Sequence, residues 1–357
     1  MNKKDIKDLP LQELEKAMVE MNELPYRAGQ IFFWLYQKGI HDFKEMKNLP
    51  KGLTEKLEET YFIQKLDPCE HQRSTDGTEK FLFKLRDAQF VETVLIFAAR
   101  RRTVCISTQV GCKLACSFCA SGKNGFVRNL APSEILNQIL YLQHALKHKI
   151  TNYVFMGMGE PLDNYENVAK TVTIMNDAKG MNVGARRITI STSGIVPGIE
   201  KLKALDLQVN LVVSLHAVSD DLRNRLMPIN RRYPLEELIK ACEAFKSKTG
   251  RMMTLEYVLL KGINDSLEDA DGLAAIAKRL RVKVNLIPYS EVPDLNFQSP
   301  ERKEMSLFME RLAQRGTKAT LRESKGKDIQ AACGQLAGKI SGKERKFRGH
   351  DKGEKSS

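Results

Sequence analysis

The sequence predicts an α/β fold: a curved, partly open parallel barrel of six strand–helix units, preceded by a small N-terminal helical/β accessory domain. Two patterns support this prediction. From about residue 100 onward, short runs of β-branched and aliphatic residues alternate with stretches of helical periodicity, which is typical of a parallel sheet with helical crossovers. Before about residue 90 there is no such alternation. Because six units are too few to close an eight-unit barrel, we expect the barrel to stay open on one side.

The accessory domain is expected to comprise residues 1–90. Amphipathic stretches predict three short helices, and two apolar runs around the turn 87–89 predict paired strands within 78–97. The helices are expected at residues 11–21, 27–39 and 51–61. Trp34 is the only tryptophan of the chain. With Phe32, Phe33 and Tyr36 it is expected to form a small hydrophobic core, the alternative being direct stacking on nucleic-acid bases.

The barrel domain is expected at residues 91–338. Its six strands are predicted at residues 103–108, 152–157, 187–192, 209–216, 252–260 and 283–290. The helices that follow them are predicted at residues 133–146, 164–177, 196–205, 234–248, 267–280 and 301–314, and a further strand at 319–324. Since the C-terminal ends of parallel strands meet at one edge, we expect the polar residues there to converge on a common site.

The charge balance favours a polyanionic partner. Of 357 residues, 57 are Lys or Arg and 44 are Asp or Glu, which gives a formal net charge of +13. Nucleic acid is the commonest partner of such a chain, and the alternative is a basic surface that serves solubility. Residues 339–357 are charged and lack apolar periodicity, so we expect them to form a basic disordered tail.

The sequence also indicates a cytoplasmic protein without a membrane partner. No apolar run approaches the length of a membrane span, and residues 1–18 are charged rather than apolar as in a signal peptide. The seven cysteines fit a reducing compartment, because their number is odd and the chain is too long to need a disulfide framework.

Three of the cysteines are crowded into eight positions. Cys112, Cys116 and Cys119 form the pattern C-x3-C-x2-C directly after the first barrel strand. A structural zinc site would need a fourth ligand, and the closest histidine, His144, lies within a predicted helix. An iron–sulfur cluster can instead leave one iron without a protein ligand. Three unrelated buried thiols are the remaining alternative.

This pattern, with Phe118 before its last cysteine, resembles that of the radical S-adenosylmethionine (radical SAM) superfamily. The resemblance implies a 4Fe-4S cluster whose open iron binds S-adenosylmethionine and whose electron cleaves it to a 5′-deoxyadenosyl radical. It also implies cofactor contacts at the strand ends. The matching residues are Gly159 and Glu160 in MGMGEPL, Ser191 in STSG, and Ser214, Leu215 and His216 in SLHA.

Further motifs resemble one group within that superfamily, the adenosine-C2 RNA methyltransferases of the RlmN type, with the C8-methylating Cfr enzymes as their relatives. The resemblance covers about residues 10–338. It rests on PYRAGQIFFWLYQKG, VETVLI, CISTQVGCKLACSFCASG, MGMGEPLDNY, RLMPINRRYPL and DIQAACGQL.

The resemblance implies several partners. Members methylate an unpaired adenosine in the peptidyl-transferase centre of 23S ribosomal RNA, and many also methylate the adenosine beside the tRNA anticodon. We therefore expect 23S rRNA before full ribosome assembly, tRNA, and a reducing electron donor such as flavodoxin or ferredoxin. The accessory domain is expected to bind RNA.

Three residue roles follow from the same resemblance. C2 of adenine is electron-poor and has no lone pair, so members first methylate a cysteine and then join its carbon to the base. Cys333 in AACGQL matches this methyl-carrying cysteine, and Cys105 in TVCIST matches the thiol that releases the product, which leaves a disulfide. Glu92 in VETVL matches the proposed base. Without the resemblance, Cys105 would be an ordinary core residue and Glu92 an ordinary strand charge.

Two positions bear on specificity, and two cysteines match no motif. Members usually have Asn where this chain has Ser290, after LIPY, so a changed cofactor contact is expected there. Pro161 in GEPL is typical of the C2 type, whereas the C8 type tends to have Ala. Cys69 and Cys242 are expected to be packing residues.

The RNA-binding surface is less well defined by the sequence. Arg100 to Arg102, Arg186 with Arg187, Arg231 with Arg232 and the tail all offer phosphate contacts. Two other classes of function stay open: a radical enzyme that acts on a small molecule or peptide, and a non-enzymatic RNA-binding protein with a structural cluster.

Overall fold

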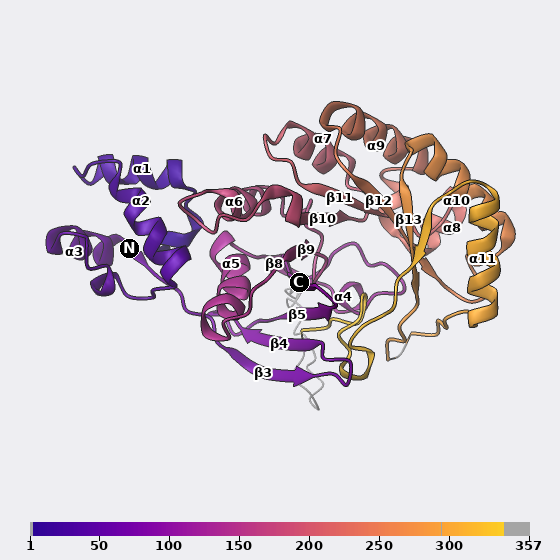
Figure 1. Cartoon of the computed structure of the whole chain (residues 1–357), viewed down its shortest axis with the longest axis horizontal. Helices are drawn as coiled ribbons and strands as arrows, with labels where there is room; N and C mark the ends of the chain where they lie inside the picture. Colours follow the sequence, from indigo (N-terminus) through magenta and orange to yellow (C-terminus); the bar gives the residue numbers. More distant parts are fainter. Residues whose placement is uncertain (1–2, 294, 339–357) are drawn as a thin grey trace, which may run out of the picture.

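The computed structural model describes residues 3–293 and 295–338, and the predicted tail at 339–357 lies outside them. Its centre is one ten-stranded sheet in the order β14-β13-β12-β11-β10-β9-β6-β5-β4-β3. From β6 to β14 all neighbours pair in parallel, and helices lie on their outer side (Figure 1). The α/β fold with an open barrel is therefore confirmed.

Each predicted strand–helix unit is present. The strands are β6 Arg101–Cys105, β9 Asn152–Phe155, β10 Ile188–Thr192, β11 Asn210–Ser214, β12 Met253–Leu259, β13 Lys283–Pro288 and β14 Ala319–Leu321. The helices are α5 Pro132–Leu140, α6 Tyr165–Asn176, α7 Val196–Ala204, α9 Leu235–Thr249, α10 Leu267–Leu280 and α11 Arg302–Gln314. Strand β12 is buried along its whole length, because helices cover one of its faces and the other face points into the barrel interior.

Three antiparallel strands extend the sheet beyond β6. The predicted pair is β4 Glu79–Lys84 and β5 Phe90–Ala98, and the edge strand β3 Pro68–Arg73 is an addition to the prediction. Strand β5 pairs with β6, with Val94 opposite Cys105. The expected domain division at residue 90/91 thus crosses a continuous sheet, and it stays a prediction.

The N-terminal helices are α1 Leu11–Glu20, α2 Arg27–Phe32, which continues as a π-helix to Lys38, and α3 Lys51–Thr60. Phe32 and Tyr36 are buried as expected, and Trp34 is half-buried with its indole N–H donating to Asn48. Phe33 is 37% exposed, so its expected place in this core was wrong. Successive residues of a helix point about 100° apart, so Phe32 and Phe33 do not share one face.

Buried polar contacts join this segment to the barrel. The short strand β1 Lys4–Asp5 pairs with β2 Tyr61–Phe62. The residues directly after β1 then contact helix α5. There the Lys7 ammonium donates to Oδ1 of Asn137 at 2.5 Å, and Asp8 accepts the backbone N–H of Ser133 at 2.8 Å. Burial lowers the pKa of Lys7 to about 8. Within the described residues, no helix is long and apolar enough to cross a membrane.

Candidate active site

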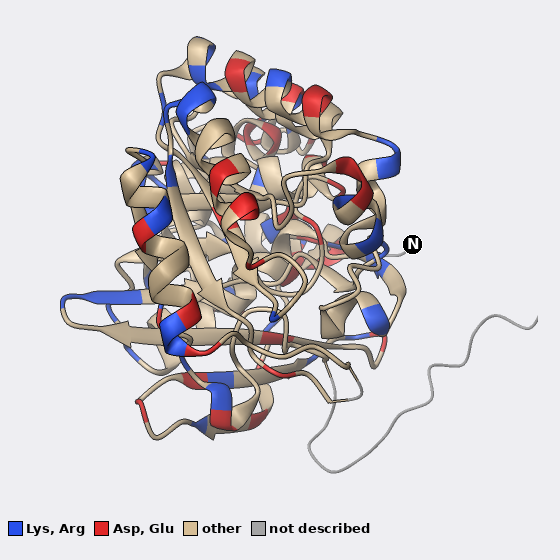
Figure 2. Cartoon of the chain, turned by 90° about the vertical axis from the view of Figure 1, so that its right-hand side faces the viewer, with Lys and Arg blue, Asp and Glu red and all other residues tan. Residues whose placement is uncertain are grey.

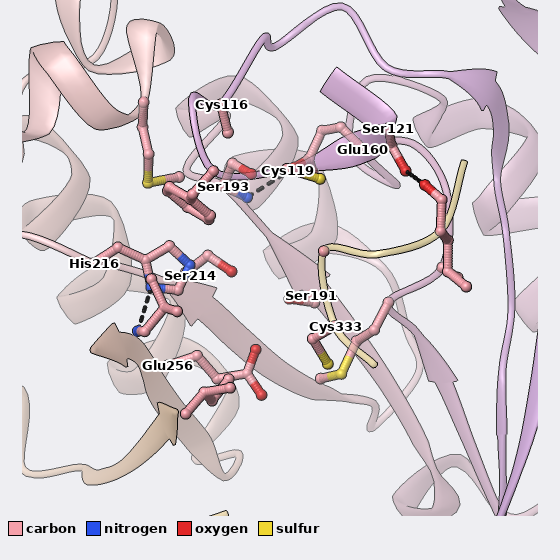
Figure 3. Close-up of a pocket in the computed structure, with 18 of the residues that line it drawn as sticks. Cys116, Cys119, Ser121, Glu160, Ser191, Ser193, Ser214, His216, Glu256 and Cys333 are labelled. Atoms are coloured by element: carbon pink, nitrogen blue, oxygen red, sulfur yellow. Dashed lines mark hydrogen bonds between the residues drawn. The ribbon is translucent and has the colours of Figure 1, made fainter. Parts of the chain in front are cut away.

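A cavity lies at the C-terminal ends of the parallel strands, where the site was expected; we call it the C-terminal cavity. Among the predicted residues, its lining includes Cys116, Cys119, Gly159, Glu160, Ser191, Ser214, His216, Ser290 and Cys333. Figure 3 shows side chains from several strand ends pointing into it. The structure thus brings together residues that lie more than 200 positions apart in the sequence.

The three clustered cysteines lie between β7 Gln109–Gly111 and the short helix α4 Ala120–Lys123. Backbone contacts hold their loop: the N–H of Cys112 donates to the carbonyl of Gly125 at 2.8 Å, and that of Cys119 donates to Cys116 at 3.2 Å. Gly111 has a φ of +72°, and a Cβ there would lie 1.9 Å from the Gly125 oxygen. Only glycine therefore permits this approach.

The three thiols lie close enough to affect one another. Burial raises the pKa of Cys112 to about 12 and that of Cys116 well above its usual range, and repulsion between the thiols adds to both shifts. The nearby Arg223 guanidinium acts in the opposite direction on Cys116. A soft, highly charged cation would reverse this penalty, so the chemistry of the three donors fits an iron–sulfur cluster. In the described part of the chain, no three His, Cys, Asp or Glu side chains are already arranged as ligands around one metal position.

Glu160 is held rigidly at the end of the β9 loop. Its backbone N–H donates to Oε1 of Gln109 at 2.8 Å, and its carboxylate accepts backbone N–H groups from Leu162 at 3.0 Å and Ser193 at 2.7 Å. Its neighbour Gly159 has a φ of +96°, and a Cβ there would lie 2.5 Å from the Gln109 side chain. The glycine is required for this close approach, as the motif suggested.

The serines and His216 come from neighbouring strand ends. Nδ1 of His216 accepts the backbone N–H of Val258 at 3.0 Å, which leaves Nε2 as the protonated nitrogen of a neutral ring. Burial and the Arg223 charge lower the pKa of His216 to about 3, so it stays neutral at physiological pH. The side chain of Leu215 is buried in the core and does not line the cavity. Its backbone N–H donates to the carbonyl of Glu256, and its carbonyl accepts from Nε of Arg223.

Cys333 lies on a segment that packs directly against α4. The backbone N–H of Ala120 donates to Gly334 at 2.7 Å, and Oγ of Ser121 donates to Leu336 at 2.7 Å. The side chain keeps accessible surface because it projects into the cavity (Figure 3). Desolvation by the surrounding protein raises the pKa of the Cys333 thiol, and the Arg322 charge opposes that shift.

A second cavity of about 510 Å³ occupies the barrel interior; we call it the lumen cavity. Cys105 and Arg322 line it, and both Cys333 and Glu256 line the two cavities. Burial, and then the neighbouring Cys333, raise the pKa of Cys105 to about 12. Nη1 of Arg322 lies 3.3 Å from Oε1 of Glu256. The two cysteines with complementary predicted roles therefore share one cavity, beside an arginine–carboxylate pair.

Glu92 lies behind this segment rather than in either cavity. Its Oε2 accepts the backbone N–H groups of Ala337 at 2.6 Å and Gly338 at 2.8 Å, and its Oε1 lies 3.0 Å from Nζ of Lys80. Glu92 is 3% exposed. As arranged here, this carboxylate anchors the C-terminal end of the Cys333 segment to strand β5.

Comparisons with known proteins agree with this geometry. Two family models match the chain: the radical SAM superfamily over residues 106–274, and the ribosomal RNA large subunit methyltransferase N-terminal domain over residues 4–63. The chain is 44% identical over 342 residues to the "Probable dual-specificity RNA methyltransferase RlmN" of Bacillus cereus (strain B4264), covering 95% of this chain and 94% of that protein. The chain belongs to the RlmN family of radical SAM RNA methyltransferases.

Other relatives support the same family. A protein of the same name from Bacillus thuringiensis (strain Al Hakam) is 44% identical over 340 residues, covering 94% of each chain. A solved structure of a radical SAM methyltransferase from Sphaerobacter thermophilus matches with a TM-score of 0.89 and 45% identity, covering 94% of this chain and 100% of that one. The fold and the RlmN family expected from the sequence are both confirmed.

Sequence reasoning missed three charged residues of this RlmN-family site: Arg223, Glu256 and Arg322. Arg223 lies on α8 Asp220–Leu226, a helix that was not predicted although Ser219 and two aspartates form a readable helix start. Its fully buried guanidinium donates to the carbonyls of Leu215 and Ser193. For Glu256 the available signal was a lone carboxylate within an apolar strand.

The two remaining cysteines differ from each other. Cys242 is 1% exposed and belongs to the core, as expected. Cys69 is exposed on the edge strand β3, and its thiol donates to the carbonyl of Leu82 at 3.3 Å. Its expected role as a packing residue was therefore wrong, because its side chain lies on the exposed face of an edge strand.

Proposed function

We propose that this RlmN-family chain methylates C2 of adenosine in RNA, at adenosine 2503 of 23S rRNA and adenosine 37 of tRNAs. The observation that carries the proposal is the position of Cys333, which lines both the C-terminal cavity and, together with Cys105, the lumen cavity. A methyl-carrying thiol must reach both a methyl donor and a target base, and a releasing thiol must lie within reach of it.

The proposed cofactors are a 4Fe-4S cluster and S-adenosylmethionine. Cys112, Cys116 and Cys119 would hold the cluster, and the residues proposed to hold S-adenosylmethionine are Gly159, Glu160, Ser191, Ser214, Leu215, His216 and Ser290. When bound, they supply the methyl group and the 5′-deoxyadenosyl radical. Leu215 can contribute through its backbone only, because its side chain is in the core. Ser290 is 4% exposed and lines the cavity, so its hydroxyl is available although shorter than the family's usual amide.

The chain's own residues would act as follows. Cys333, as the thiolate favoured by Arg322, accepts the methyl group on sulfur and presents its carbon to the adenine. Once the 5′-deoxyadenosyl radical has taken one hydrogen atom from the S-methyl group, the methylene carbon would bond to C2 of the adenine. C2 would then lose its proton to Glu92, and the one surplus electron would return to the cluster. Cys105 attacks the Cys333 sulfur, so a sulfur–sulfur bond forms and the carbon–sulfur bond breaks with its electron pair on carbon. That carbon takes up a proton to become the methyl group of the released base, and the two cysteines are left oxidised to a disulfide. For Glu92 to accept the adenine proton, the contacts with Ala337 and Gly338 must first open.

The proposed setting is the cytoplasm, with 23S rRNA and tRNA as substrates and a low-potential protein such as flavodoxin or ferredoxin as electron donor. Pro161, which favours C2 over C8 by resemblance, lines the C-terminal cavity next to Glu160.

The test is anaerobic turnover of reconstituted protein with a reductant, S-adenosylmethionine and RNA, followed by mass spectrometry of the nucleosides. We expect 5′-deoxyadenosine together with 2-methyladenosine. Formation of 8-methyladenosine would assign the C8 activity instead, and 5′-deoxyadenosine with unmodified RNA would point to a small-molecule or peptide substrate. Absence of 5′-deoxyadenosine from protein with a full cluster would favour a structural cluster.

A further inference from the structure

Basic side chains gather at the N-terminal ends of the parallel strands, the edge opposite the C-terminal cavity. The chain offers Arg101 and Arg102 at the start of β6, Arg186 and Arg187 before β10, Arg251 before β12, and Lys283 at the start of β13. We call these six residues the basic rim. Five of them are exposed and Arg251 is half-buried.

The rim residues share one edge because the strands are parallel and in register. The carbonyl of Arg102 accepts the N–H of Thr151 at 2.9 Å, just before β9. The carbonyl of Arg186 accepts Nδ2 of Asn210 at 2.8 Å, and the guanidinium of Arg251 donates to Oδ1 of the same asparagine at 3.2 Å. Burial, and then the neighbouring Arg186 charge, lower the pKa of Arg251, and the second effect is expected for cations held side by side.

The rim differs from the outer helices in its lack of acidic partners. On the helices, Arg279 pairs with Glu236 and Glu243, and Arg311 and Arg315 both pair with Asp271. Figure 2 shows Lys and Arg interspersed with Asp and Glu on these helices. Within the described residues, none of the six rim side chains forms an ion pair with a carboxylate. Unpaired, exposed cations on one edge provide a favourable surface for phosphates.

The lumen cavity connects this rim to the reactive cysteines. At one end it is lined by Arg101, Met252 and Lys283, all of which are exposed. At the other end it is lined by Cys105 and Cys333. Arg101 and Cys105 are four residues apart on one strand, so the depth is roughly 13 Å at about 3.3 Å per residue. A stacked duplex cannot enter such a space, whereas one unstacked nucleotide can.

We infer that RNA docks on the basic rim, with its phosphates on these six cations, and that the target adenosine enters the lumen cavity from this edge. The inference rests on the proposed function, because it takes RNA to be the substrate. It assigns opposite ends of the barrel to the two reactants: the cofactors occupy the C-terminal cavity, and the nucleotide approaches from the rim. Cys333 lies where the two meet.

The inference also divides the arginines that the sequence suggested for phosphate contact. Arg101, Arg102, Arg186 and Arg187 belong to the rim. Arg231 and Arg232 instead lie at a 3-10 turn after α8, and Arg232 lines a groove beside the β9 and β10 loops at the opposite edge. They take no part in the docking proposed here.

The test compares two double charge reversals in the full chain. Arg101→Glu with Lys283→Glu changes the rim at the cavity mouth, and the matched control, Arg302→Glu with Lys303→Glu, makes the same change at the exposed start of α11 on the opposite edge. The probe is an RNA stem–loop with an unpaired loop adenosine, titrated over a range of salt concentrations. We expect the rim variant to bind at least about tenfold more weakly, with a salt slope shallower by about 1.4 for two lost single-strand contacts. The control should bind within about twofold of the wild type, and thermal unfolding should confirm that both variants fold.

Crosslinking gives a second measurement that needs no rim variant. A photoreactive group on the ribose next to the target adenosine should crosslink within residues 98–102, 186–187, 251–252 or 281–283. Crosslinks confined to residues 224–232 or 299–304, or equal affinity of wild type and rim variant, would overturn the inference while leaving the proposed function intact. A wild-type protein that binds no RNA would overturn both.

Discussion

The backbone N–H of Ala337 donates to Oε2 of Glu92 at 2.6 Å, so strand β5 directly holds the segment that carries Cys333. The same oxygen accepts the backbone N–H of Gly338, and the Lys80 ammonium forms an ion pair with the other carboxylate oxygen. The proposed base Glu92 and the segment of the proposed methyl carrier Cys333 are thus linked by hydrogen bonds. As the proposed base, Glu92 could accept the adenine proton only after this segment has shifted, which would couple proton removal to movement of Cys333.

The first prediction concerns Glu92→Gln. The amide cannot accept the adenine proton, so we expect a covalent protein–RNA complex to accumulate. It also leaves the buried Lys80 without its carboxylate, which should lower the free energy of unfolding by about 1–3 kcal/mol. A ribonuclease-sensitive band on a denaturing gel and a urea titration measure the two effects. Faster hydrogen exchange at residues 331–338 with no trapped complex would show that Glu92 is a positioning residue only.

The second prediction separates the two cysteines. Cys333→Ala has no methyl carrier, so it should form neither methylated protein nor an RNA adduct. Cys105→Ala can still be methylated and join the base, but it cannot attack the bridging sulfur. It should therefore carry covalently bound RNA when purified from cells, visible as a shifted band that ribonuclease removes. Cys242→Ala, at a buried thiol outside both cavities, is the matched control and should carry none. Identical behaviour of the Cys105 and Cys333 variants would mean that these roles are misassigned.

The third prediction concerns the charge beside Cys333. Arg322 lowers the pKa of this thiol and Glu256 raises it. Arg322→Gln should therefore move the pH midpoint of Cys333 alkylation upward, and Glu256→Gln should move it downward. Arg322→Lys keeps the charge and should stay near the wild type. Mass spectrometry of the Cys333 peptide after timed iodoacetamide treatment gives the midpoints. Shifts of the same sign for both neutral variants would rule out the electrostatic explanation.

The fourth prediction concerns the clustered cysteines. Anaerobically reconstituted protein should carry about four irons per chain, because the three thiols are assigned to one 4Fe-4S cluster. Cys116→Ala should lose most of that iron, whereas Cys69→Ala, at an exposed thiol on β3, should keep it. Iron and zinc are measured together by elemental analysis. Stoichiometric zinc without iron in the wild type would contradict the assignment.

The sequence by itself determined the alternation of strands and helices, the open barrel and the cysteine loop. These features depend on local patterns: apolar periodicity sets each element, and Cys112, Cys116 and Cys119 lie within eight positions. The motif around Cys333 was also recognisable in the sequence, because it consists of residues directly adjacent to this cysteine. The short helix α8 also has a local signal, because Ser219 caps its start and two aspartates occupy its first turn.

Only the tertiary structure decided which distant groups meet. Glu92 and Ala337 are 245 residues apart, and Arg322 and Glu256 are 66 apart, so their contacts depend on strand order and register rather than on local pattern. The same holds for the basic rim, since Arg101 and Lys283 share an edge only because their strands run parallel in one sheet. Phe33 and Cys69 show the converse: both are exposed although their residue types favour burial. Residue type is local, whereas burial and charge pairing are properties of the folded arrangement.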